Sequence, residues 1–120
     1  MQGKRVERVS ALIKEELSSL ILRSLKDPRI GFVTVTRVTV SHDLRSAKVY
    51  ISSAQGGGAQ RREALTGLKS ATGFLRGELT RRLRLRYAPT LLFYPDDSVE
   101  EGLHLAELLR QIQIEESEEQ

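Results

Sequence analysis

The sequence predicts an α+β domain of two layers, in which a three-stranded sheet is covered on one face by helices. The prediction rests on the spacing of apolar residues along the 120-residue chain. A helical spacing comes first, two β-branched segments follow, and two helical segments separate these from a third strand. The expected order is α-β-β-α-α-β plus a C-terminal helix, with a hairpin between the first strands and a crossover before the third. A chain of this length is expected to form one domain.

An amphipathic helix is predicted over residues 4–25. Its apolar side chains recur every three or four positions and therefore share one face; they are Val6, Val9, Ile13, Leu17, Leu20 and Ile21. Asp27-Pro28 ends this helix, because the residue before a proline is pushed out of the α conformation. Arg29 follows, and two interpretations stay open: a plain helix stop, or an anion contact through the Arg29 guanidinium.

Two β-branched segments, residues 32–41 and 46–53, are predicted strands. The alternation in the first changes phase between Val35 and Val38. A bulge near Thr36-Arg37 explains the change, because one extra residue resets the alternation. Burial of both faces of the strand is the competing explanation. Residues 42–45 are expected to connect the two strands as a hairpin.

The second half of the chain is predicted to hold two helices that meet at a kink, a short strand and a last helix. Helical spacing starts near Gln60 and is interrupted at residues 70–73, where glycine and threonine weaken a helix. Pro89 is expected to stop the second of these helices, and residues 90–94 to form the third strand. Residues 95–98 offer capping groups for the last helix, whose apolar positions are Val99, Leu103, Ala106, Leu109 and Ile112. We expect residues 1–114 to form a single domain and residues 115–120 a frayed acidic tail.

The net charge of +3 conceals two unequal parts of the chain. Residues 1–94 hold 18 Lys and Arg against 7 Asp and Glu, whereas residues 95–120 hold 1 Arg against 9 Asp and Glu. A body at +11 followed by a segment at −8 is typical of a protein that binds polyanions and carries an acidic end.

The positive charge of the body is concentrated in residues 60–86, which carry +6. Arginine dominates this segment, and its planar guanidinium forms forked bonds to phosphate that lysine cannot form. Leucines occupy the core-facing side of the predicted helices. The arginines are therefore expected to form a basic outer surface that attracts a phosphate backbone. The alternative is a solvated helix face whose arginines pair with acidic residues of the C-terminal segment.

Catalytic and metal-binding patterns are missing from the sequence. The chain has no cysteine, and its two histidines, His42 and His104, lack the spacing of a zinc hydrolase. Gly56-Gly57-Gly58 has no following lysine, so a flexible linker is favoured over a phosphate-binding loop. The carboxylates after Pro95 are better explained as helix caps than as metal ligands. We therefore expect no catalysis, no metal and no cofactor.

Targeting and membrane signals are also missing from the sequence. No apolar run approaches the roughly 20 residues that span a bilayer, and Met1–Arg5 is not followed by the apolar segment of a signal peptide. We expect a cytoplasmic monomer that does not bind membranes.

The number and positions of the aromatic residues indicate how RNA would be bound. Reading of single-stranded bases needs exposed aromatic rings on adjacent strands, and among the three Phe and three Tyr only Tyr50 is expected to be well placed. The sequence therefore favours docking on structured RNA through its phosphates and shape.

The predicted element order is that of a type II KH domain, yet the chain contains no Gly-x-x-Gly, the motif by which KH domains hold a nucleic-acid backbone. Ala71-Thr72-Gly73 stands at that place, and an Ala-x-Gly kink there resembles the ribosome-binding factor A family. Other stretches that resemble this family are Arg5-Val6-Glu7-Arg8-Val9, Asp27-Pro28-Arg29-Ile30-Gly31, Val33-Thr34-Val35-Thr36-x-Val38, Asp43-Leu44-x-x-Ala47-Lys48-Val49-Tyr50, Gly73-Phe74-Leu75-Arg76, Leu85-Arg86-Tyr87-Ala88-Pro89 and Leu92-Phe93-Tyr94-Pro95-Asp96.

The resemblance implies a non-catalytic factor with a type II KH-like domain. It implies binding to 16S rRNA in the free 30S subunit, support of late maturation and 5′-end processing of that rRNA, and a role in growth in the cold. A general KH-type RNA-binding protein or chaperone without ribosome specificity is the alternative. An RNA-processing enzyme and a protein-interaction module with an acidic tail are further alternatives from other functional classes.

Candidate RNA-binding residues are the basic side chains of the body, and the interhelical kink is expected to set the angle of the basic helices. Glycine at position 73 is expected to be needed for close packing or unusual backbone angles, and Arg76, Arg81 and Arg82 are expected to be exposed. The RNA-binding candidates are Lys4, Arg5, Arg8, Arg29, Arg45, Lys69, Arg76, Arg81, Arg82, Arg84 and Arg86, and the kink residues are Ala71, Thr72 and Gly73.

Overall fold

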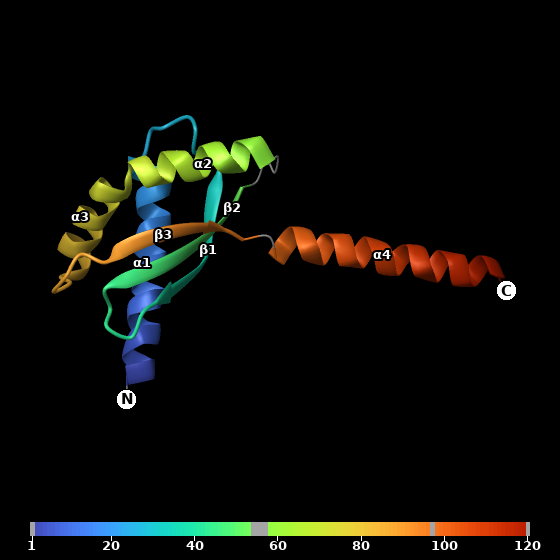
Figure 1. The fold of residues 1–120 in the computed structure, drawn as a ribbon, viewed down its shortest axis with the longest axis horizontal. Coiled ribbons are helices and arrows are strands. Elements are labelled where there is room, and N and C mark those ends of the chain that lie inside the picture. Colours follow the sequence, from blue (N-terminus) through green and yellow to red (C-terminus); the bar gives the residue numbers. More distant parts are fainter. Residues whose placement is uncertain (1, 54–57, 97, 120) are drawn as a thin grey trace.

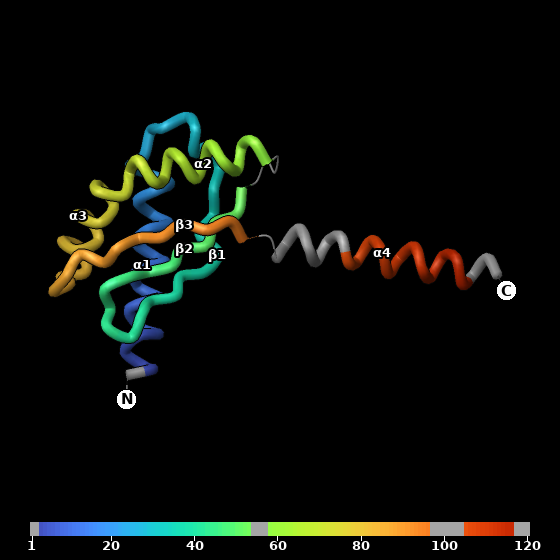
Figure 2. Tube along the Cα trace, in the orientation of Figure 1, coloured from blue at the N-terminus to red at the C-terminus, as the bar shows by residue number. Residues whose placement is uncertain are grey.

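A computed structural model describes residues 2–53, 58–96 and 98–119 of the chain. Four helices and three strands follow one another in the predicted order, as Figure 1 shows. The helices are α1 (Gln2–Ser24), α2 (Gly58–Ser70), α3 (Thr72–Leu83) and α4 (Ser98–Glu119), and the strands are β1 (Val33–Val40), β2 (Ser46–Ser53) and β3 (Thr90–Pro95). The predicted α+β architecture is confirmed. The trace in Figure 2 shows α1, α2 and α3 beside a single sheet.

The three strands form one mixed sheet in the order β1-β2-β3. β1 pairs with β2 antiparallel, and β2 pairs with β3 in parallel, as a hairpin and a crossover require. The register of the hairpin shifts between Val35 and Arg37, so the predicted bulge is confirmed. Burial of both strand faces is not needed to explain the change of phase, because Thr34, Arg37 and Thr39 are exposed.

The core lies between one face of the sheet and the helices α1, α2 and α3. Ala47, Val49 and Ile51 of the central strand are at most 1% exposed. They meet aliphatic side chains from each helix, and burying one such side chain contributes roughly 1.5–3 kcal/mol. The helical members of the core are Ile13, Leu17, Leu20, Ile21, Ala64, Leu68, Leu75 and Leu79.

The predicted break between the two middle helices is confirmed at Ala71, the single residue between α2 and α3. The Ala71 amide donates to the carbonyls of Gly67 and Leu68, both at 3.1 Å, and the Leu75 amide donates to the Ala71 carbonyl at 3.0 Å. The chain therefore turns into a new helix without losing its hydrogen bonds.

Glycine is not needed at position 73, contrary to the expectation from the sequence. A Cβ built on Gly73 meets nothing within 4 Å, and its φ is negative. Close packing instead requires a glycine at position 67 in α2, where a Cβ would lie 2.7 Å from Cγ1 of Ile30.

The end of α3 differs from the prediction that Pro89 stops it. The helix ends at Leu83, because Arg84 adopts a left-handed backbone with φ of 51° and its amide donates to the carbonyl of Thr80. The Leu85 amide donates to the same carbonyl at 3.1 Å. Such a left-handed residue closes a helix by satisfying its last carbonyls. Pro89 instead lies buried in the connection to β3.

Helix α4 projects away from the other elements in Figure 1 instead of joining the core. Its described apolar side chains, including that of Ala106, are exposed. The large ones are Leu105, Leu108, Leu109, Ile112 and Ile114. The helix continues to Glu119, whereas a frayed segment was expected from residue 115. The expectations for the side chains of Val99, Leu103 and His104, and for Gly56, Gly57 and Asp97, lie outside the described residues.

Candidate nucleic-acid interface

A cleft of about 510 Å³ lies where the first half of α1, the β1–β2 turn and the α3–β3 loop meet. Its apolar lining side chains are buried or half-buried, whereas its charged and aromatic ones are exposed. We call it the basic cleft because it contains three arginines and one carboxylate. Its lining residues are Arg5, Val6, Val9, Ile13, His42, Asp43, Leu44, Leu83, Arg84, Leu85, Arg86, Tyr87 and Pro89.

The β1–β2 turn is held by the carboxylate of Asp43. The Ser41 hydroxyl donates to Oδ1 of Asp43 at 2.7 Å, and the Arg45 amide donates to the same oxygen at 3.1 Å. These two hydrogen bonds, that of Ser41 first, lower the pKa of Asp43, so the carboxylate stays ionised at neutral pH. The turn is joined to β3 by a bond of 2.8 Å from the Thr90 amide to the Arg45 carbonyl.

The α3–β3 loop is fixed by Arg76, a residue that sequence analysis expected to be exposed and to bind RNA. Arg76 is half-buried, and its Nε donates to the Pro89 carbonyl at 2.8 Å while its Nη2 donates to the Ala88 carbonyl at 3.0 Å. The expected exposure is wrong, because the Ala88 and Pro89 carbonyls of the loop accept hydrogen bonds from the guanidinium. Arg76 positions the loop that carries Arg84, Arg86 and Tyr87.

Removing the Arg76 side chain is therefore expected to lower stability. Arg76→Gln should reduce the free energy of unfolding by about 1–3 kcal/mol, because two carbonyls lose a charged donor. Arg81→Gln, at an exposed position on the same helix, should change it by less than about 0.5 kcal/mol. Urea denaturation of the two variants measures the difference, and equal stabilities would contradict a structural role for Arg76.

Tyr87 is the aromatic centre of the basic cleft. The guanidinium carbon of Arg45 lies 4.9 Å from the centre of its ring, and that of Arg86 lies 5.4 Å away. Both distances fit cation–π contacts, and Tyr87 is 48% exposed. The ring thus holds two cations at the solvent-facing edge of the cleft.

The N-terminal turns of α1 supply the other basic side chains near the cleft. Arg5 lines the cleft, and Lys4, Arg5 and Arg8 are all exposed. Arg5 and Arg8 are three positions apart and therefore neighbours on the helix surface. Among the residues that the structure describes, no carboxylate forms an ion pair with Arg5, Arg84 or Arg86.

Three other candidates are engaged in ion pairs away from the cleft. The Arg29 Nε donates to both carboxylate oxygens of Asp27 at 3.0 Å, and this bond lowers the pKa of Asp27. On α3, Arg81 and Arg82 both reach Glu78. The Asp27–Arg29 pair favours the helix-stop interpretation. These ion pairs leave fewer arginines available to bind phosphate than the sequence suggested.

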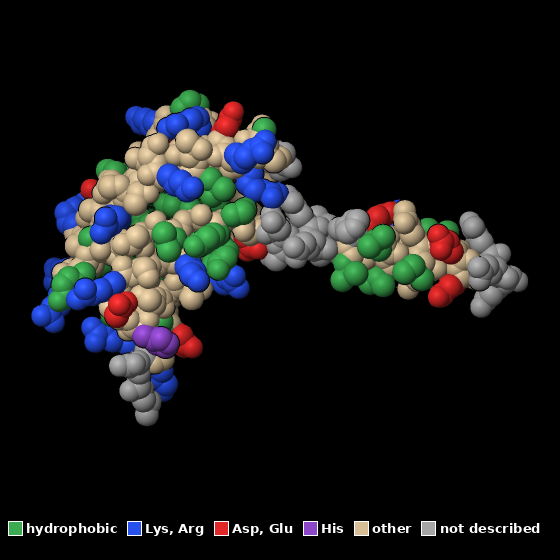
Figure 3. Space-filling model, in the orientation of Figure 1, with side chains coloured by type: hydrophobic (Ala, Val, Ile, Leu, Met, Phe, Trp, Pro, Cys, Tyr) green, Lys and Arg blue, Asp and Glu red, His purple; other side chains and the backbone are tan. Residues whose placement is uncertain are grey.

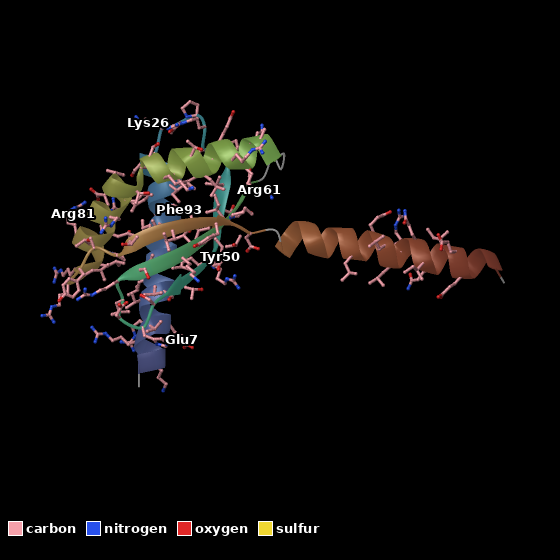
Figure 4. The ribbon with its side chains drawn as sticks, viewed as in Figure 1. Glu7, Lys26, Tyr50, Arg61, Arg81 and Phe93 are labelled. Atoms are coloured by element: carbon pink, nitrogen blue, oxygen red, sulfur yellow. The ribbon has the colours of Figure 1, made fainter. Side chains whose placement is uncertain are left out.

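The predicted RNA-binding residues fall into those that line the basic cleft, such as Arg84 and Arg86, and those that lie outside it, such as Lys69. Lysine and arginine side chains gather over the α3 end of the body in Figure 3. Lys69 is exposed on α2. Arg81 points away from the body (Figure 4). His42 and Tyr87 also line the cleft, although neither was among the predicted RNA-binding residues.

The described residues form neither a metal site nor a membrane-spanning helix. No cluster of three or more His, Cys, Asp or Glu in this part of the chain could hold a metal ion. None of the helices in the described ranges is long and apolar enough to cross a membrane.

Comparison with known proteins decides the family. The family model described as ribosome-binding factor A matches residues 5–109. The chain belongs to the ribosome-binding factor A family. Ribosome-binding factor A of Desulfitobacterium hafniense is 48% identical over 120 residues, which cover 100% of this chain and 95% of that protein. The Halothermothrix orenii protein is 46% identical over 116 residues, which cover 97% and 94% of the two chains.

Solved structures of ribosome-binding factor A share the fold. The crystal structure of the Thermus thermophilus protein has a TM-score of 0.67 and 32% identity, and the match covers 75% of this chain and 94% of that one. The solution structure from Thermotoga maritima, described as a putative member, has a TM-score of 0.56 and 35% identity, with 77% and 83% covered. A homology model of the Thermus thermophilus protein, fitted into a cryo-EM map of its 30S complex, has a TM-score of 0.61 and 33% identity, with 73% and 91% covered.

Proposed function

We propose that this protein is an RNA-binding assembly factor of the small ribosomal subunit, and that its basic cleft binds the phosphates of 16S rRNA. The observation that carries the proposal is the cleft itself, where α1 supplies Arg5 and the α3–β3 loop supplies Arg84 and Arg86 to one lining. The guanidinium groups of Arg45 and Arg86 lie over the ring of Tyr87 in the same place. The 30S complex of the Thermus thermophilus relative supports the choice of partner.

The mechanism is binding, with no chemical step. Guanidinium groups neutralise phosphates and release the counterions condensed on the RNA, so affinity falls steeply as salt rises. Forked hydrogen bonds from arginine fix the phosphate direction. Arg76 and the Asp43 turn hold the two loops in place before RNA arrives, which reduces the ordering cost of binding.

The finer parts of the proposal come from the family resemblance. The protein is proposed to bind free 30S subunits as a cytoplasmic monomer. It would support late maturation and 5′-end processing of 16S rRNA, a need that grows in the cold. In this role the protein would stabilise one arrangement of the rRNA while other enzymes cut it.

Cosedimentation with purified ribosomal particles tests the proposal. Binding to free small subunits should be strong at low salt and should fall steeply between roughly 50 and 200 mM salt. Equal binding to large subunits, whole ribosomes and an unrelated structured RNA would contradict it and would favour a general KH-type RNA-binding protein. Cleavage of precursor rRNA by the pure protein with magnesium would contradict the non-catalytic role.

A further inference from the structure

The outer face of the sheet is not covered by any helix in the described part of the chain, as Figure 1 shows. The helices α1, α2 and α3 all pack on the opposite face. Side chains on the outer face include Arg37, Tyr50 and Tyr94, which come from β1, β2 and β3 in turn. Figure 4 shows Tyr50 on the central strand.

These three side chains form one row across the sheet, because they are partners in the strand register. Arg37 is paired with Tyr50, and Tyr50 with Tyr94. The guanidinium carbon of Arg37 lies 4.1 Å from the centre of the Tyr50 ring. The rings of Tyr50 and Tyr94 have centres 5.7 Å apart and planes 30° apart. We call this set the aromatic row.

Most side chains around the aromatic row are short hydroxyl groups, with one lysine and one leucine among them. Thr34 and Ser52 flank it on one side, and Thr39, Lys48 and Leu92 on the other. Arg37 and Lys48 are exposed cations. The carboxylate of Asp96, near the end of the row, accepts a hydrogen bond from the Thr36 hydroxyl in the bulge.

We infer that the aromatic row is a second RNA site, which stacks the unpaired base of a single-stranded nucleotide on the exposed ring of Tyr94. Bases stack on exposed aromatic side chains of a sheet, and nearby cations hold the backbone. The inference rests on the proposed function and adds a class of ligand: unpaired nucleotides beside the structured RNA of the basic cleft. It also corrects the expectation that Tyr50 stands alone, since Tyr94 joins it.

RNA fits this face better than a protein surface does. Outside the two rings, Leu92 is the exposed large hydrophobic residue among the positions that flank the row, and it is 39% exposed. This apolar area is small for a protein interface, whose buried core is rich in apolar side chains. Short hydroxyl side chains let a flat base approach the rings, and both cations suit phosphate.

The row is distinct from the basic cleft. Arg37 and His42 are five residues apart along the chain. At about 3.3 Å per strand residue, this places the row roughly 15 Å from the turn. A variant of the row therefore leaves the cleft arginines and their supporting hydrogen bonds unchanged.

A single-stranded RNA oligonucleotide that contains 2-aminopurine tests the inference with the full chain. Binding to the wild-type protein should quench the base, because stacking on tyrosine quenches its fluorescence. Tyr94→Ala should abolish the quenching and weaken single-strand binding by about fivefold or more, while binding to a blunt RNA duplex should stay the same. Tyr94→Phe keeps the ring and should restore both properties.

Phe32→Ala is the matched control, because it removes a ring that is 72% exposed and lies outside the row. It should leave the quenching intact.

If Tyr94→Ala binds small subunits and the oligonucleotide as the wild type does, the inference fails while the proposed function stands. If the wild type fails to bind small subunits, the proposed function fails separately. Stronger RNA binding after Leu105→Ser with Leu109→Ser would show that α4 occupies the face, and would overturn the inference.

Discussion

Replacing Arg5 and Arg86 together by glutamate is expected to weaken binding to small ribosomal subunits by about tenfold or more at low salt, and to lower the salt dependence of binding. Both side chains line the basic cleft but come from elements far apart in the sequence, α1 and the α3–β3 loop. Each phosphate contact that is lost removes roughly 0.9 from the slope of log affinity against log salt. The double variant should therefore lose about two units of slope.

The fold is expected to survive this double change. Both residues are exposed, and glutamate in the first turn of α1 interacts favourably with the helix dipole. Arg23→Glu with Lys26→Glu makes the same change in net charge at exposed positions near the other end of α1. This control should keep most of the affinity and slope. Equal losses in the two double variants would show that only net charge matters, and would contradict a localised cleft.

Replacing Gly67 by valine is expected to lower the free energy of unfolding by about 1–3 kcal/mol, because extra atoms in a packed core force its neighbours to move. A Cβ at this position would lie 2.7 Å from Cγ1 of Ile30 and 3.3 Å from Oδ2 of Asp27. Ile30 is only 5% exposed, so its side chain has little room to move. The change would also crowd the carboxylate of Asp27, which pairs with Arg29 in the loop after α1.

Gly77→Val is the matched control for Gly67→Val. It adds the same side chain to a helix, but a Cβ at Gly77 meets nothing within 4 Å. Valine has a higher helix propensity than glycine, so this variant should be as stable as the wild type or more so. Gly73→Val should behave in the same way, contrary to the expectation from the sequence. Urea denaturation compares the three variants, and a loss at Gly77 or Gly73 as large as at Gly67 would contradict the packing argument.

Local patterns predicted the local structure well. The change of phase between Val35 and Val38 located the bulge, because strand alternation depends on adjacent residues alone. The weak helix formers around Ala71 located the break between α2 and α3 for the same reason. Both features follow from neighbouring residues and needed no knowledge of the tertiary fold.

Features that depend on distant contacts could not be predicted in this way. The spacing of Arg76 on its helix suggested an exposed guanidinium, but two carbonyls of the following loop hold it. Tyr94 joins Tyr50 only through the parallel pairing of β2 with β3. The apolar positions of α4 suggested a packed helix, yet its described side chains are exposed.

The sequence predicted the positive charge of the candidate site but not its position in the fold. The concentration of arginine in residues 60–86 indicated a polyanion partner. Charge alone did not separate Arg81 and Arg82, which bind Glu78, from Arg84 and Arg86, which line the cleft. That division comes from the left-handed turn at Arg84, where the chain leaves α3 and enters the loop.

Directed hydroxyl-radical probing of 16S rRNA tests the central claim most directly. The chain has no cysteine, so a single introduced cysteine can carry an iron chelate at one chosen position on the small subunit complex. His42→Cys places the chelate on the basic cleft, and Leu22→Cys places it near the far end of α1 at an exposed position. We expect strong, localised rRNA cleavage from position 42 and little from position 22. Stronger cleavage from position 22 than from position 42 would contradict the claim that the basic cleft faces the rRNA.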